Sequence, residues 1–511
     1  MSSETGKHKI VKRIARVFTL LLVLFLGVIL FIRSPWGQDI IVNKLIDYVS
    51  DKTATKIEID KLFLTFSGDI QLEGLYLEDK KGDTLLYSKL LEADIEFSPL
   101  LFDNTLELDN LEWEGVTARI LRNKDAEKFN FTFFQEAFAA QDLTAEPETV
   151  EPFQLVIGSV ALKDFDVVYI DAFLGIESKI ICGDLLLDVD ELDLMAMHFA
   201  VDNLEIQNTQ VDYKQTKAIS ASDGETIAVL PYISIGDLSL ENVQANYGSS
   251  PDDLEIQTDL FEFSINSLEA DIAKARYDVE DFTLNNSNIS LKIDNVKGEG
   301  QDAIVNQSST DFQWPAFHIA ASEIEMDNNT FIYGRGNTAP VKGVFNRDAI
   351  SLQNFSFRSN DLAYAPKLVN LNVEALSFLE KSGFLLQQMT FKSHFQERSA
   401  KLENFTLRTN HSSITGAVAL KYPSVEQLFS APRRVSLEAA IPEIQIGMED
   451  VFHFQPSLSS NSYLSTTKQH PLKGQIFAAG SLENIKVEDT QLRWGDRTWF
   501  SLGGTINKPP V

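Results

Sequence analysis

The sequence predicts a mainly β protein in which an N-terminal transmembrane helix is followed by an elongated, curled repeat β-sheet that forms a groove-like rod. Three observations support this fold class. Residues 17–32 form a run of sixteen uncharged, mostly apolar residues. Most of the chain after this run alternates apolar and polar side chains with period two, which is typical of strands. A strand-containing unit then recurs between residues 151 and 333, which favours a stacked β body over a compact globule.

The apolar run is interpreted as a retained membrane anchor, with removal as a signal peptide as the alternative. Sixteen residues rise about 24 Å as a helix, slightly less than a hydrocarbon core of about 30 Å, and Arg16 and Arg33 can extend their charges to the interface. A cleavable signal would end in small residues, whereas this run ends in Leu-Phe-Ile-Arg. Basic residues before the run keep the N-terminus cytoplasmic. The residues taken to represent the anchor are Val17, Leu22, Phe25 and Ile32.

The composition restricts the classes of partner. The 511 residues carry a formal net charge of −30, so the chain repels nucleic acid. Membrane contact beyond the anchor is expected to be apolar or to use local basic residues. The single cysteine, Cys182, excludes an intramolecular disulfide and a cysteine metal cluster within one chain, and we expect it to be a small buried apolar residue.

The elements after the anchor begin with a helix. Residues 36–50 have apolar side chains at helical spacing and are predicted to form a short amphipathic helix. Residues 129–139 are predicted to form a short helix. Between them the pattern alternates, as in Leu106-Glu107-Leu108-Asp109, which predicts a sheet with one apolar and one solvated face. Turns or bulges are expected at Gly68, Gly74, Gly82 and Gly115. The predicted divisions are a tail and anchor over 1–33, an N-terminal module over 34–139, an acidic linker over 140–151 and a repeat β-rod over 152–511.

The repeat is clearest in three segments, residues 151–170, 230–247 and 314–333. Each has a proline at its second position, continues as an alternating strand, passes a polar Asp or Asn turn and reaches a tyrosine. The proline is expected at the start of a strand, because it cannot donate a hydrogen bond to a ladder. Two related strand–turn–strand units without the proline are predicted at 279–293 and 402–420.

Motifs for catalysis are missing from the sequence. It contains no HExxH, no G-x-S-x-G and neither of the glycine-rich phosphate-binding patterns. The seven histidines are scattered singly, which is more typical of structural residues than of ligands. The acidic stretch 188–193 lacks the glycine of a calcium loop and fits a solvated strand face. The sequence therefore predicts no enzyme and no catalytic, cofactor-binding or metal-binding residue.

The apolar face of the sheet is what remains as a working surface. It could be the core of a compact β-sandwich, or the lining of a groove that is open along one edge and shields acyl chains. The candidate groove residues are Leu62, Leu64, Phe66, Leu72, Leu106 and Leu108.

Three stretches of the chain suggest a family. The first runs from the basic tail and anchor into residues 57–89, with Gly68-Asp69 and Gly82-Asp83-Thr84-Leu85 as its most specific pieces. The second is the proline-to-tyrosine repeat, and the third is the glycine-containing repeat over residues 471–510. Together they resemble the TamB proteins of the AsmA-like superfamily, most closely the Bacteroidota-type members.

The resemblance implies a bacterial inner-membrane protein whose β-rod lies in the periplasm and carries phospholipid toward the outer membrane. It also implies a possible partner, an outer-membrane barrel of the BamA or TamA type. Family members commonly run far longer, so we expect this chain to be a fragment of a longer product or a shorter AsmA-like protein.

The apolar face and the resemblance favour two functions. The first is a phospholipid conduit that uses the apolar groove between the inner and outer membranes. The second is a scaffold for outer-membrane protein assembly or secretion that binds a barrel partner and carries no lipid. A glycan-active or other enzyme is disfavoured by the missing motifs.

Overall fold

The computed structural model describes residues 27, 30–31, 34–64, 69–96, 98–99, 105–125, 128–138, 154–193, 195–218, 230–294, 312–466, 468–481, 483–495 and 497–507. The chain divides into two compact units, Met1–Leu192 (unit 1) and Asp193–Val511 (unit 2). Within the described ranges no helix combines the length and the apolar character needed to cross a membrane. The anchor residues Val17, Leu22, Phe25 and Ile32 and the linker 140–151 lie outside those ranges, so both stay predictions.

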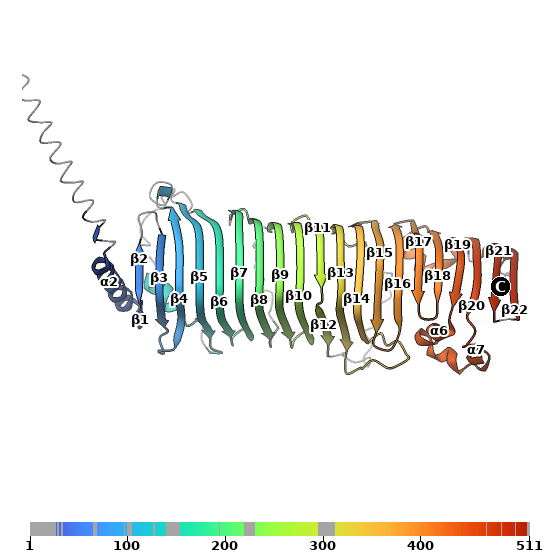
Figure 1. Ribbon diagram of the computed structural model, residues 1–511, viewed down its shortest axis with the longest axis horizontal. Coiled ribbons are helices and arrows are strands. Elements are labelled where there is room, and N and C mark those ends of the chain that lie inside the picture. The colour runs from blue at the N-terminus through green and yellow to red at the C-terminus, as the bar shows by residue number, and fades with distance from the viewer. Residues whose placement is uncertain are drawn as a thin grey trace, which may run out of the picture. The chain divides into compact units, whose positions relative to one another are not determined.

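Unit 1 is a sheet preceded by a helix (Figure 1). Its elements are α2 (Pro35–Thr53), β1 (Ile57–Glu58), β2 (Lys61–Leu64), β3 (Asp69–Glu78), β4 (Thr84–Glu96), β5 (Thr105–Arg122), α4 (Thr132–Phe138), β6 (Gln154–Asp171) and β7 (Ile176–Asp193). Strands β1 and β2 both pair with β3, and from β3 onward each strand pairs with the next. All of these pairs are antiparallel except β5–β6, which is parallel.

Unit 2 is a longer sheet of the same kind (Figure 1). Its strands are β8 (His198–Gln215), β9 (Tyr232–Ser249), β10 (Leu254–Asp271), β11 (Arg276–Asn285), β12 (Asn288–Ile293), β13 (His318–Arg335), β14 (Ala349–Ala365), β15 (Leu368–Glu380), β16 (Leu385–Gln396), β17 (Ser399–Thr409), β18 (Ser413–Lys421), β19 (Ser436–Ile446), β20 (Leu472–Ser481), β21 (Asn484–Trp494) and β22 (Thr498–Asn507). Its helices are α5 (Val425–Ser430), η1 (Pro432–Arg434), α6 (Met448–Phe454), η2 (Pro456–Ser460) and α7 (Ser462–Thr466).

Helix α2 confirms the helix predicted at 36–50. Ser34 caps its N-terminus by accepting a hydrogen bond from the Gly37 amide, and Ala54 ends it in the left-handed conformation. Helix α4 confirms the second predicted helix, and the ring of Phe138 lies 6.2 Å from that of Tyr48 in α2.

The three proline-containing segments are the strands that pair in parallel with the strand before them. They correspond to β6, β9 and β13, and their parallel partners are β5, β8 and the β11–β12 pair. A parallel partner requires the chain to return to the same end of the sheet, so each of these strands follows a long connection rather than a hairpin. Pro231 directly precedes β9, as predicted for a residue that cannot donate to the ladder.

The turn predicted inside each of these segments is wrong. Asp164, Asn242 and Asn328 lie in the middle of continuous strands of 18 residues and adopt positive φ angles of 54°, 55° and 53°. Asp and Asn tolerate this left-handed conformation, and a single residue in it makes a β-bulge instead of reversing the chain. The bulges align across strands, because Asn242 Nδ2 donates to Asn208 Oδ1 at 2.8 Å.

The two units without the proline differ from each other. Residues 402–420 contain the predicted hairpin, in which β17 and β18 are antiparallel. Residues 279–293 are interrupted at Asn286, which has a φ of 51°, but both halves continue along the same two neighbours, β10 and β13. This segment is therefore one broken strand and not a strand–turn–strand unit. Three of the four glycine predictions are confirmed, because Gly74 and Gly115 are bulges inside strands and Gly82 lies in the β3–β4 turn. Gly68 lies outside the described residues.

The bulges keep the apolar side chains on one face. Each apolar residue of this face in β5 pairs with an apolar residue or tyrosine in β6. In order along the strands, the β5 residues are Leu106, Leu108, Leu111, Trp113, Val116, Ala118 and Ile120, and their β6 partners are Leu155, Ile157, Val160, Leu162, Phe165, Val167 and Tyr169. The spacing changes from two to three at 108–111 and at 113–116. Strands β8 and β9 repeat the pattern with the same changes of spacing. A one-residue shift would normally turn side chains to the opposite face, and the bulge absorbs that shift.

We predict that the bulge at Asn242 tolerates glycine and is destabilised by a β-branched residue. Asn242→Val should lower local stability by about 1–2 kcal/mol, because a left-handed residue with a branched Cβ is strained. Asn242→Gly should cost less, since it loses only the exposed hydrogen bond to Asn208. Amide hydrogen exchange in β9 and the urea midpoint measure both effects, and equal values for the two variants would contradict the assignment.

We also predict an acid-sensitive contact at the ends of β5 and β6. The Arg122 guanidinium and the backbone N–H groups of Leu174 and Phe173 lower the pKa of the buried Asp171, against the opposing effect of burial. A lowered pKa stabilises the fold above the pKa of the unfolded chain, and this stabilisation is lost as pH falls through the folded value. Asp171→Asn should therefore destabilise unit 1 by about 1–2 kcal/mol at pH 7 and by progressively less below pH ~4. A constant difference between pH 7 and pH 3 would exclude this role.

Candidate functional site

The predicted groove residues that the structure describes lie on one face of unit 1. Leu62 pairs with Leu72, Leu72 with Leu91, and Leu91 with Trp113, so these side chains form a row across four strands. Leu106 and Leu108 belong to the apolar set of β5 defined above. Leu62, Leu72, Leu106 and Leu108 are half-buried. Leu64 pairs with Ile70, and Phe66 lies outside the described residues.

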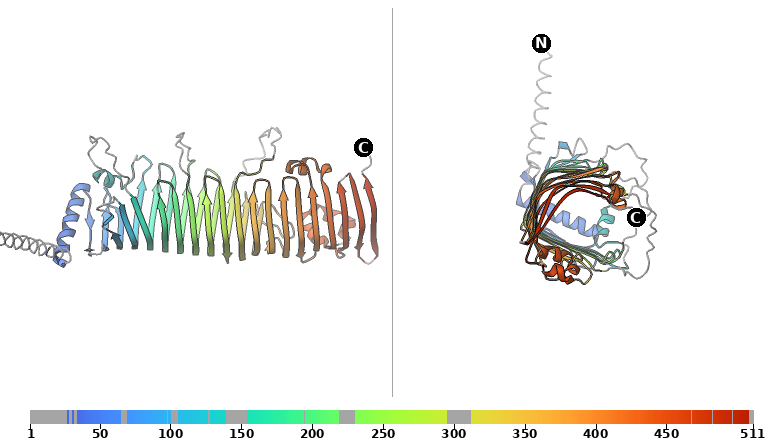
Figure 2. Two further views of the ribbon diagram at one scale, coloured as in Figure 1. Left: turned by 90° about the horizontal axis from the view of Figure 1, so that it is seen from above. Right: turned by 90° about the vertical axis from the view of Figure 1, so that its right-hand side faces the viewer.

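Unit 2 has an apolar face of its own, made of residues beyond those predicted for the groove. In β9 the apolar set is half-buried except for Val243, which is buried, whereas Asp237, Glu241 and Gln244 on the same strand are exposed. Figure 2 shows the strands of unit 2 bent into an arc in the view along the sheet. The less exposed set is expected on the concave side of such an arc, so we assign the apolar side chains to it. The changes of spacing between apolar residues are the signal that could have identified the whole set.

No second sheet covers this face in the described part of the chain (Figures 1 and 2). Contacts between strands run between ladder neighbours. In a β-sandwich the inward side chains are fully buried in continuous rows, but here the buried apolar residues are mostly isolated members of their strands, such as Val116, Val243 and Val373. The described residues contain one cluster of buried apolar side chains, made of Tyr422, Val425 at the start of α5, and Val435. Burial there raises the pKa of Tyr422 to about 12.

A line of phenylalanine rings leads along the face in unit 2 to helix α6. Phe331 lies 4.9 Å from Phe355, Phe355 lies 6.3 Å from Phe378, and Phe378 lies 6.2 Å from Phe384, measured between ring centroids. Phe384 then contacts Phe454 of α6 at 4.9 Å. These separations are those of ordinary aromatic pairs. Helix α6 therefore packs against the end of the apolar face.

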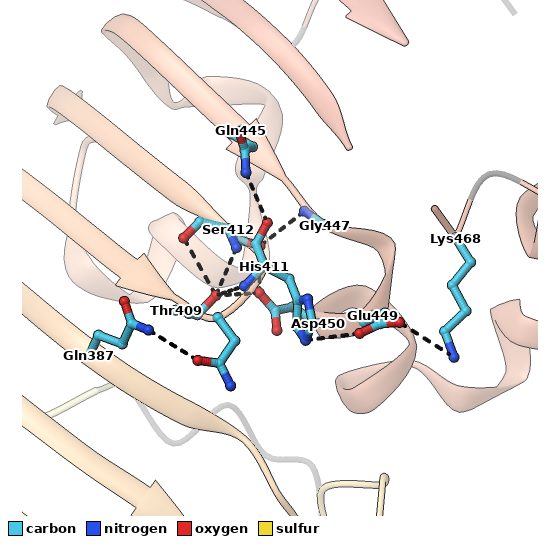
Figure 3. Close-up of polar contacts among 10 residues, drawn as sticks. Gln387, Thr409, His411, Ser412, Gln445, Gly447, Glu449, Asp450 and Lys468 are labelled. Carbon is cyan, nitrogen blue, oxygen red and sulfur yellow. Dashed lines mark hydrogen bonds and ion pairs between the residues drawn. The ribbon is translucent and has the colours of Figure 1, made fainter. Parts of the chain in front are cut away.

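Polar contacts hold α6 on the β17–β18 hairpin (Figure 3). Asp450 Oδ2 accepts hydrogen bonds from the hydroxyls of Thr409 and Ser412, both at 2.5 Å, and the Gly447 amide donates to Ser412 Oγ at 3.1 Å. Beside them His411 Nε2 lies 2.9 Å from Glu449 Oε2. Three of these residues, His411, Glu449 and Asp450, line a hollow of about 520 Å³ between α6, α7 and the β15–β16 turn.

A buried polar cluster under α6 was missed at the sequence level. Ser382 Oγ donates to Glu380 Oε2 and lies 2.8 Å from His453 Nε2, and the three residues are 2%, 2% and 8% exposed. In serine hydrolases the histidine lies between the serine and the acid, whereas here the serine lies between the other two. The cluster therefore satisfies buried polar groups at the β15–β16 turn and does not match a nucleophile–base arrangement.

Other chemistry is sparse in the described residues. They contain no group of three His, Cys, Asp or Glu side chains that could hold a metal ion. Cys182 is buried within β7, where it was expected to behave as a small apolar residue. On the polar face, burial and the neighbouring Asp69 raise the pKa of Asp94, which fits a surface dense in carboxylates.

No protein-family model, no curated protein and no solved structure matches this chain. The resemblance to TamB proteins consequently depends on the motifs described above.

We predict that Asp450 keeps α6 in place. Asp450→Ala removes the acceptor of two hydroxyls and should release α6 locally, at a cost of about 2 kcal/mol. Asp450→Asn keeps one acceptor oxygen and should have a smaller effect. Amide hydrogen exchange and limited proteolysis across residues 447–466 measure the change, and protection equal to that of the wild type in both variants would contradict it.

Proposed function

We propose that the chain carries phospholipid along the apolar face of its sheets. The observation that supports this best is a row of half-buried apolar side chains that runs from strand to strand without a second layer over it in the described residues. Apolar side chains that stay partly exposed in adjoining strands favour a partner that covers them. Acyl chains are suitable partners, because burial of each methylene contributes about 0.8 kcal/mol and needs no directional contact.

The charge distribution agrees with this proposal. The polar face keeps its carboxylates in water, and the net charge of −30 disfavours adsorption of that face to anionic headgroups. The inner-membrane anchor, the periplasmic location and a barrel partner of the BamA or TamA type complete the proposal, and they are supported by the apolar run and by the family resemblance.

The scaffold for outer-membrane protein assembly remains the second candidate. It is supported by the family resemblance, which implies a barrel partner of the BamA or TamA type.

Charges on the apolar face should abolish lipid transfer. In full-length chain inserted into donor vesicles, Leu72→Asp with Leu108→Asp should reduce transfer of acyl-labelled phospholipid to acceptor vesicles to the protein-free rate, because each carboxylate must be desolvated against the tails. The matched control, Gln71→Asp with Thr117→Asp, adds the same charge on the opposite face and should transfer normally.

Circular dichroism checks that both double variants keep their strand content. Transfer at the wild-type rate by a folded Leu72→Asp, Leu108→Asp variant would reject lipid carriage along the apolar face, and a wild type no faster than the protein-free rate would reject lipid carriage itself. Either outcome would move the scaffold function to first place, since a scaffold does not need an apolar lining.

A further inference from the structure

The hollow beside α6 combines opposite charges at its surface. Lys342 and Lys468 line it together with Glu449 and Asp450. These four side chains sum to zero charge at neutral pH, in a chain whose net charge is −30. Because the carboxylates offset the lysines, the hollow is suited to a zwitterion and disfavours an anion.

Lys468 and one oxygen of Glu449 are available to a ligand. Lys468 Nζ lies 3.7 Å from Glu449 Oε1, beyond hydrogen-bond distance, and their side chains are 54% and 41% exposed (Figure 3). The other oxygen of Glu449, Oε2, lies 2.9 Å from His411 Nε2. Lys342 is exposed on the neighbouring loop. Asp450 accepts hydrogen bonds from the hydroxyls of Thr409 and Ser412, which hold α6 in place. A ligand with an ammonium and a phosphate could therefore exchange this loose ion pair for two closer ones.

One wall of the hollow belongs to the apolar face. Phe384 lines it, and the same ring contacts Phe378, which leads on to Phe355. A ligand in the hollow would thus have its polar end near Glu449 and Lys468 and an apolar continuation along the phenylalanine rings. The volume of about 520 Å³ falls in the range of small-molecule sites.

We propose that this hollow binds a zwitterionic ethanolamine-phosphate headgroup. The ammonium pairs with Glu449, the phosphate pairs with Lys468 and Lys342, and the acyl chains lie on the apolar face from Phe384 onward. The inference rests on the proposed function, which it extends from phospholipid in general to one headgroup class. A soluble ethanolamine phosphate offers the same polar chemistry, and the test separates the two sources.

The experiment uses full-length chain in vesicles that contain equal amounts of phosphatidylethanolamine and phosphatidylglycerol, each tested with a photoreactive acyl chain. Crosslinks are counted only in peptides from residues 318–396. The wild type should favour phosphatidylethanolamine by about fivefold, the size expected for one partly exposed ion pair. Glu449→Gln and Lys468→Gln should each bring the ratio close to one. Lys342→Gln tests the hollow from the loop between β13 and β14, so the test still stands if substitutions in the β19–β20 connection disturb folding.

The matched control is Lys486→Gln with Glu488→Gln, an exposed ion pair on β21 of the same unit, which should leave the ratio unchanged. Equal crosslinking of both lipids by the wild type, or a ratio that survives all three hollow variants, would overturn the headgroup site while leaving lipid carriage intact. No crosslink to residues 318–396 from either lipid would overturn lipid carriage itself. Soluble glycerophosphoethanolamine that binds the hollow without any phosphatidylethanolamine preference would assign the site to a free small molecule and reject the lipid assignment.

Discussion

The long strands β5, β6, β8 and β9 keep a set of apolar side chains on one face, although the spacing within that set changes twice from two to three. Left-handed bulges, as at Asp164, Asn242 and Asn328, meet this constraint at the second change of spacing. Each bulge shifts the alternation by one residue, and the neighbouring strand must shift at the same ladder position or its apolar residues would point to the wrong side. The pairing of Leu106 to Ile120 with Leu155 to Tyr169 shows this coordination, with the same changes of spacing in both strands. The one-sided face, and with it the proposed groove, depends on that agreement.

Such a sheet is stabilised in a different way from a globular core. Most of the buried apolar side chains are isolated members of their strands, while several fully buried side chains are polar. Asn329, for example, accepts from the Ser287 amide at 2.9 Å and donates to the Leu284 carbonyl at 2.6 Å, which closes the break between β11 and β12. Buried polar groups are tolerated only when their hydrogen bonds are made, so these contacts also fix which strand positions can bend. Ladder hydrogen bonds and such bridges leave the apolar face free for a ligand.

Helix α6 marks the place in unit 2 where the regular sheet acquires a specific site. The hydroxyls of Thr409 and Ser412 hold it by donating to Asp450, and the ring of Phe454 contacts that of Phe384. Glu449 adds a contact to His411 through Oε2, and its Oε1 faces Lys468 at 3.7 Å, so Oε1 and Lys468 are the groups that the proposed headgroup site uses. The same helix joins a polar hollow to an apolar surface, and an amphiphile needs both.

The sequence by itself determined the β class, helices α2 and α4, the absence of catalytic motifs and the one-sided alternation, because period-two and helical spacing are local properties of the chain. It also located the proline-containing segments, since a proline beside a strand is a local signal. It did not reveal that Asp164, Asn242 and Asn328 bulge within strands, because an Asn or Asp flanked by alternating residues is equally compatible with a tight turn. Only the tertiary structure decided between the two, through pairing with a neighbour that bends at the same position. The hollow at α6 likewise required the fold, because its residues come from three connections that only the register of β14 to β20 brings together. Lys342 lies between β13 and β14, Phe384 between β15 and β16, and Glu449 and Lys468 between β19 and β20.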